Sequence, residues 1–135
     1  MGKVQKIEGI GFEYAKELSK ASVFTTDDLL AKGSTPQGRQ EIGNISSISE
    51  NLILKWVRIA DFFRIKGINE EYSELLEEAG VTDVPALAAC KDHVKLLLQM
   101  EKVNKRRSLV RHMPSEEMLK DWITQAKKLP GVIKG

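Results

Sequence analysis

Apolar residues recur along most of this chain at the three- and four-residue spacing of amphipathic helices. One such pattern runs over residues 10–21, and a matching one covers residues 72–79. Longer patterns predict helices from about Ser49 to Phe63 and from about Ser115 to Leu129, each opened by a capping serine. No segment keeps the two-residue alternation of a strand, so the sequence predicts an all-α protein.

Small and polar residues between these patterns predict where shorter helices begin and end. Thr26 is expected to cap a short helix with two aspartates in its first turn, and that helix is expected to end near Gly33. Thr35 and Pro36 predict the start of the next helix, because proline is favoured at the first helical position. Gly80 is expected to close a later helix in the left-handed conformation.

The chain contains an internal repeat. Residues 7–30 align without a gap on residues 65–88, with nine identities in 24 positions. The identical pairs are Ile7/Ile65, Gly9/Gly67, Ile10/Ile68, Glu13/Glu71, Tyr14/Tyr72, Leu18/Leu76, Ala21/Ala79, Val23/Val81 and Leu29/Leu87. A second match relates residues 49–60 to 115–126 at an offset of 66 instead of 58, so about eight extra residues lie within the second copy.

The 135 residues thus divide into two predicted units, residues 1–62 and 63–135, packed as one compact body. No apolar stretch approaches the ~20 residues that span a bilayer, and no signal-like segment opens the chain, so we expect a cytoplasmic protein without a membrane partner. One cysteine excludes an internal disulfide framework. The net charge of +2 gives no global attraction to nucleic acid, so that role needs a local basic patch.

The most specific motif lies at Gly9-Ile10-Gly11. With Ile7 and Ala15 it resembles the helix-hairpin-helix motif, in which two glycines flank an apolar residue and a small residue follows after three positions. The glycines permit a tight turn, and the next helix presents free N–H groups at its positive dipole end, which suits a phosphate. The resemblance implies a hairpin that grips the nucleic-acid backbone without reading sequence, here with Lys16 beside it.

The second copy of this motif is altered. Gly67 keeps the first glycine, whereas Asn69 replaces the second glycine and Ser73 replaces the alanine. Asparagine tolerates the left-handed region, so the turn is expected to survive. Gly67 remains a candidate contact, and the first hairpin is the better candidate for a phosphate.

Two further resemblances extend the comparison. Residues 46–60, with I-S-E-x-x-I-L-x-W at their centre, are similar to the second hairpin of the amino-terminal helical domain of archaeal recombinases and their eukaryotic relatives. The whole chain resembles an uncharacterised stand-alone family, classed as a domain of unknown function, with two helix-hairpin-helix units in tandem. The elements W-V-x-x-A-D and R-I-K-G between Leu52 and Glu71 are the most distinctive. The resemblance implies the fold, and nucleic-acid binding only by analogy.

Charge is unevenly distributed along the chain. Residues 70–83 carry six acidic side chains and no basic one, whereas residues 91–111 carry a net charge of +5. The basic candidates for phosphate contacts are Lys102, Lys105, Arg106, Arg107 and Arg111. For the acidic segment we expect solvated acids that also stabilise the helix, with an electrostatic docking face as the alternative. A solvated helical face is likewise an alternative for the basic segment. A third alternative for the basic segment is an acidic protein partner, including the acidic segment of a second copy.

No catalytic or metal-binding set is recognisable. Residues 33–38 have the glycine spacing of a phosphate-binding loop, but Arg39 stands where lysine is required. Cys90 and His93 could share a helical face, yet only His112 is an obvious third metal ligand. We therefore expect no enzyme activity, metal or cofactor. For Trp56 and Trp122, at equivalent repeat positions, core packing is favoured over base stacking.

The sequence is consistent with two functions. The first is a non-enzymatic module that binds the DNA or RNA backbone without sequence specificity, through the hairpin amides and the basic patch. The second is a helical protein-interaction scaffold that kept the architecture and lost DNA binding. Asn69 and the acidic segment favour the second, and the basic cluster favours the first.

Overall fold

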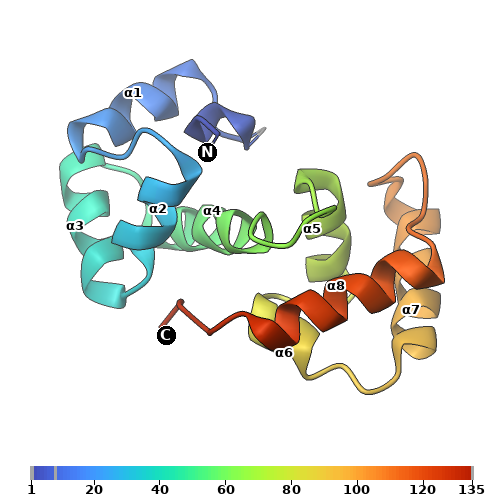
Figure 1. The fold of residues 1–135 in the computed structure, drawn as a ribbon. Coiled ribbons are helices and arrows are strands. Elements are labelled where there is room, and N and C mark those ends of the chain that lie inside the picture. The colour runs from blue at the N-terminus through green and yellow to red at the C-terminus, as the bar shows by residue number, and fades with distance from the viewer. Residues whose placement is uncertain (1, 8, 135) are drawn as a thin grey trace. The chain divides into compact units, whose positions relative to one another are not determined.

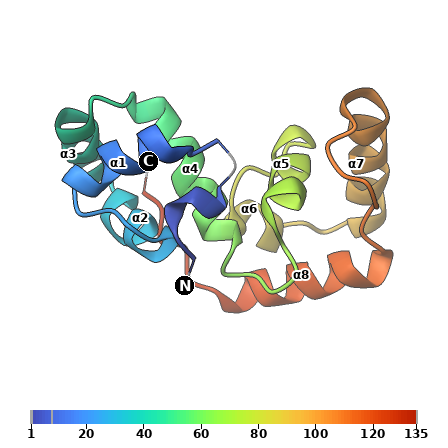
Figure 2. The same cartoon turned by 90° about the horizontal axis from the view of Figure 1, so that it is seen from above.

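A computed structural model describes residues 2–7 and 9–134. The described residues form eight α-helices, one short 3-10 helix and no strand, which confirms the predicted all-α class. Figures 1 and 2 show the helices from two sides. The elements are η1 (Val4–Lys6), α1 (Phe12–Lys20), α2 (Thr26–Gly33), α3 (Pro36–Ser46), α4 (Glu50–Phe62), α5 (Glu70–Glu78), α6 (Val84–Ala88), α7 (His93–Arg107) and α8 (Glu116–Lys128).

The helices group into two compact units. The first unit comprises Met1–Asp61 together with Val132–Gly135, and the second comprises Phe62–Gly131. The last residues therefore belong with the first unit, whereas the sequence division assigned them to the second. Packing of the two units as one body stays a prediction.

The first unit is built around apolar faces of α1 to α4. Both α1 and α2 pack on α3, and η1 packs on α1 and α2. Leu18, Leu29, Ile53 and Trp56 are buried in this unit, and burial of each such side chain contributes about 1.5–3 kcal/mol. The structure thus confirms core packing for Trp56.

Arg39 ties the carboxyl-terminal segment to this unit. Its guanidinium is buried and donates to the carbonyl oxygens of Gly33 and Lys134, at 2.8 and 2.6 Å. Burial lowers the pKa of Arg39, although arginine remains charged at neutral pH. Thr35 caps α3 by accepting from the Gly38 N–H at 3.0 Å. Residues 33–38 are therefore a helix-to-helix turn, as the proline at the first position of α3 predicts.

The second unit has one continuous core. In this unit α8 packs on α6 and α7, and α5 packs on α7. Among the buried side chains are Phe62, Leu76, Met100 and Trp122, which confirms core packing for Trp122 as well. Cys90 is half-buried against the same core, not fully buried.

The repeat seen in the sequence reappears in the helices. α1 and α5 each have nine residues, and α4 and α8 each have 13. α7 has 15 residues against 11 in α3, so part of the predicted extra length lies in the helix that carries the basic cluster. Identification of each unit with the helix-hairpin-helix motif stays a prediction.

Two local predictions were wrong. The cap of α2 is Thr25, not Thr26, because the Thr25 hydroxyl accepts from the Asp28 N–H while the Asp28 carboxylate accepts from the Thr25 N–H. Asn69 does not use the left-handed region, since its φ is −98°. The left-handed residues at these turns are Gly67 and, as predicted, Gly80.

Candidate nucleic-acid interface

The start of α1 is open. Gly11 is its cap residue, with extended backbone and no side chain to accept from the helix. The first helical bond runs from the Ala15 N–H to the Gly11 carbonyl at 3.0 Å, so the N–H groups of residues 12–14 lie outside the helical ladder. A Cβ atom on Gly11 would meet nothing within 4 Å. Neither backbone strain nor packing therefore requires a glycine here, and its absence of a side chain leaves the amides accessible.

The other two residues of the hairpin motif, Gly9 and Ile10, face the core of the first unit. Ile10 is buried, and a Cβ atom on Gly9 would lie 3.5 Å from Nε1 of Trp56, an ordinary contact. Tyr14 packs against the same indole with 5.1 Å between ring centroids. Glu8, within the motif, lies outside the described residues. The hairpin thus packs against Trp56, and the start of α1 lies at the surface.

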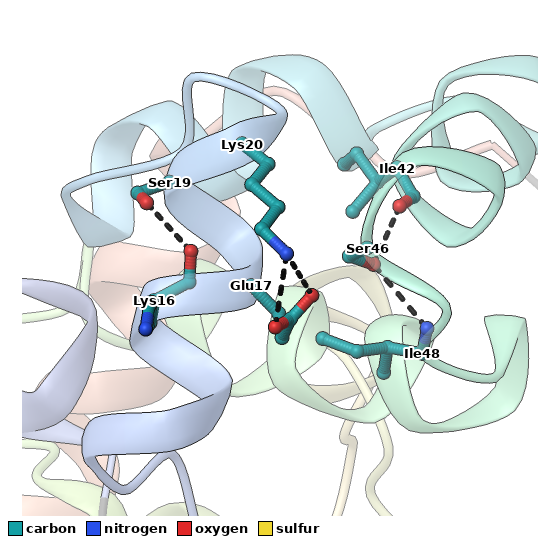
Figure 3. Close-up of polar contacts among 7 residues, drawn as sticks. All are labelled: Lys16, Glu17, Ser19, Lys20, Ile42, Ser46 and Ile48. Atoms are coloured by element: carbon teal, nitrogen blue, oxygen red, sulfur yellow. Dashed lines mark hydrogen bonds and ion pairs between the residues drawn. The ribbon is translucent and has the colours of Figure 1, made fainter.

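The charged residues of α1 divide between two faces. Figure 3 shows Glu17 and Lys20 paired on one side of the helix, with 3.0 Å between the Lys20 amine and the nearer carboxylate oxygen. Lys16 lies with Ser19 on the other side, where the Ser19 hydroxyl donates to the Lys16 carbonyl at 2.6 Å. Lys16 is exposed and has no ion-pair partner among the described residues. Its cation is therefore available to an anion.

A groove of about 580 Å³ runs beside this face of α1. Its lining comes from η1, α1 and the residues before α2: Lys3, Val4, Gln5, Phe12, Ala15, Lys16, Ser19, Val23, Phe24 and Thr25. Phe12 is 79% exposed and Phe24 is 56% exposed, the two highest values among the large apolar side chains of the described residues. Sequence reasoning missed Lys3, Phe12 and Phe24. Phe12 could have indicated the groove from the sequence, because an aromatic residue at the first position of a helix faces solvent.

The start of α5, the equivalent helix in the second unit, is closed. Asn69 occupies the cap position, and its Oδ1 accepts from the Tyr72 N–H at 2.9 Å. Gly67 has a φ of +99°, and a Cβ atom there would come within 2.8 Å of Nε1 of Trp122. Gly67 is thus required by the turn and by its contact with the indole, while its predicted role at a phosphate stays a prediction.

Three of the four residues of α1 that line the groove are replaced by acids in α5. At the offset of 58, Phe12, Lys16 and Ser19 correspond to Glu70, Glu74 and Glu77. Carboxylates in the first turn of a helix stabilise it and repel phosphate. The first turn of α5 carries Glu70 and Glu71, whereas that of α1 carries Glu13 alone. The two hairpin helices therefore have the same length and opposite charge on one face.

The basic cluster lies in the second unit, at the end of α7. Lys102, Lys105 and Arg106 are exposed, as is Arg111 beyond the helix. The Arg107 guanidinium pairs with the Glu78 carboxylate of α5 at 3.3 Å. Cations also stabilise the negative end of a helix dipole, which gives this cluster a structural role. Lys102, Lys105, Arg106 and Arg111 remain predicted phosphate contacts, and part of the acidic segment neutralises part of the basic one within a single unit.

Within the described residues, no group of three or more His, Cys, Asp and Glu side chains could hold a metal ion. His93 pairs with Glu116 at 2.8 Å, and this hydrogen bond lowers the pKa of the Glu116 carboxyl. Among the described helices, none is both long and apolar enough to cross a membrane.

Comparison with protein families identifies the chain. The family model for a domain of unknown function, DUF4332, matches residues 8–129. The chain therefore belongs to this family. Neither the curated proteins nor the solved structures gave a match.

Proposed function

We propose that this member of the DUF4332 family binds nucleic acid without sequence specificity, by gripping the phosphate backbone at the start of α1. The observation that carries the proposal is the uncapped helix start at Gly11: the N–H groups of residues 12–14 have no hydrogen-bond partner among the described residues, and a Cβ atom on Gly11 would meet nothing within 4 Å. Backbone N–H groups and the positive dipole end together favour an anion at such a place. Such contacts go to phosphate and carry no sequence information.

Lys16 supports the same assignment. It lies one turn after the open amides, is exposed, and has no ion-pair partner among the described residues. A lysine in that position adds a point charge for the same phosphate or the next one along the strand. The basic cluster at the end of α7 is a secondary contact in this proposal, because Arg107 already pairs with Glu78.

Fluorescence anisotropy with a labelled DNA strand at low salt tests the proposal. Gly11→Asn gives α1 the cap that α5 already has, without strain, because a Cβ atom at Gly11 meets nothing within 4 Å. We expect affinity to fall by about tenfold, since a hydrogen bond to a charged group contributes about 1.5–3 kcal/mol. Backbone N–H resonances of residues 12–14 should shift on DNA addition in the wild type and not in the variant.

The matched control is Asn69→Gly, which opens the start of α5. Glu70 and Glu71 still lie in the first turn of α5, so we expect no gain in affinity. Absence of binding to any nucleic acid at low salt would overturn the proposal. In that case the acidic face of α5 favours the second function, a protein-interaction scaffold with a basic partner.

A further inference from the structure

We propose that the groove beside α1, lined by Lys3, Phe12, Lys16 and Phe24, holds unpaired nucleobases, so that the substrate class of this protein is single-stranded nucleic acid. The proposal rests on the proposed function and deepens it. It concerns a different part of the molecule from the open amides, namely two aromatic side chains and the hollow between them.

The first argument is the exposure of the two phenylalanines. Phe12 and Phe24 are more exposed than any other large apolar side chain in the described part of the chain, and both line the same groove. A phenylalanine kept in water loses the free energy that burial would supply. Two of them side by side around one hollow mark a binding surface better than scattered single residues do.

The second argument is charge. Lys3 and Lys16 are the charged residues of the lining, and neither has an ion-pair partner among the described residues. A ligand that matches this groove therefore has a flat apolar part for the two phenylalanines and an anionic part for the two lysines. Nucleotides combine a planar base with a phosphate, and bases stack on exposed aromatic side chains whatever their sequence.

The third argument distinguishes a single strand from a duplex. A paired base inside a duplex is stacked on both faces, so it cannot reach a side chain in a groove unless it is unstacked at a cost of a few kcal/mol. An unpaired base is available at once. The groove of about 580 Å³ lies beside Phe12, the first residue of α1, so a base there and a phosphate at the open amides belong to neighbouring positions of one strand.

The second unit lacks these features. Phe12 and Lys16 correspond to Glu70 and Glu74, and Phe24 corresponds to Thr82. No aromatic side chain stands at either equivalent position. The combination of aromatic residues and lysines is therefore a property of the first unit and not of the repeat.

The test compares three labelled probes by fluorescence anisotropy: an oligothymidylate, an abasic strand of the same length, and a fully paired duplex. We expect the wild-type protein to bind oligothymidylate about fivefold or more tightly than the abasic strand, and the duplex more weakly than oligothymidylate. Phe12→Ala and Phe24→Ala should each weaken oligothymidylate binding by about fivefold and leave abasic binding unchanged.

The matched control is Ile45→Ala, which removes an apolar side chain of similar exposure, 52%, from α3 of the same unit and outside the groove. It should change neither affinity. Circular dichroism should show unchanged helicity in all three variants.

Equal binding of oligothymidylate and the abasic strand would overturn this inference and leave the phosphate proposal standing. No binding of either strand would overturn both. A further experiment measures binding to vesicles that contain phosphatidylserine. If Phe12→Ala abolishes vesicle binding and leaves oligothymidylate binding unchanged, the groove binds a lipid surface and the inference is wrong.

Discussion

In the first unit Tyr14 packs on Trp56, and in the second unit Tyr72 packs on Trp122, with 5.1 Å between ring centroids in both pairs. A glycine approaches each indole from the preceding turn, Gly9 in the first unit and Gly67 in the second. The hairpin helix then begins with an open glycine in one unit and a self-capping asparagine in the other. The packing of the hairpin is thus repeated, while the surface of its helix is not.

This difference separates two requirements on the same sequence motif, namely packing in the core and the chemistry of the exposed surface. The tryptophan positions are set by the core, so they are the same in both units whatever the function. Residues at the helix start and on its groove side contact solvent, so they are free to differ. A repeat of the motif therefore establishes common packing and says nothing about whether both copies bind a phosphate.

The largest expected effect concerns the two glycines. Gly67→Ala should destabilise the second unit by about 2–3 kcal/mol, because the residue has a positive φ and the new methyl would press on a buried indole. Gly9→Ala should cost under about 1 kcal/mol, since its Cβ has an ordinary contact with Trp56. Urea unfolding followed by circular dichroism measures both, and equal losses would contradict the comparison.

The next effect concerns charge at equivalent positions. Lys16→Glu gives α1 the acid that α5 carries at Glu74, and we expect nucleic-acid affinity at low salt to fall by about tenfold. The reverse change, Glu74→Lys, should raise affinity by less than about twofold, because Asn69 still accepts from the Tyr72 N–H and Glu70 and Glu71 remain in the first turn of α5. A gain with Glu74→Lys as large as the loss with Lys16→Glu would show that net charge alone decides binding.

Sequence patterns predicted the helices well and the surface poorly. The helices at Glu50–Phe62 and Glu116–Lys128 match their predicted spans to within one residue at each end, because serine caps and apolar periodicity both act locally. Asn69 was misread, since asparagine suits either a left-handed turn or a helix cap and only the backbone decides between them.

The groove could not be predicted in the same way. Its lining joins Lys3 to Phe24 across the turn between α1 and α2, and sequence spacing does not specify which side chains meet across a turn. The basic cluster was found from the sequence, but its pairing with Glu78 was not, because that contact joins α7 to α5.

The smallest effect concerns this pairing between α7 and α5. Glu78→Gln removes the carboxylate that holds Arg107 at 3.3 Å, and both side chains are about half exposed, so unfolding free energy should change by less than about 0.5 kcal/mol. The informative measurement for Glu78→Gln is nucleic-acid affinity. If the end of α7 were the main phosphate site, a released arginine would raise nucleic-acid affinity and steepen its salt dependence by nearly one charge. We expect the affinity to stay within about twofold of wild type and the salt slope to stay unchanged, because the first unit supplies the main contacts. A clear rise would move the interface from the start of α1 to the end of α7.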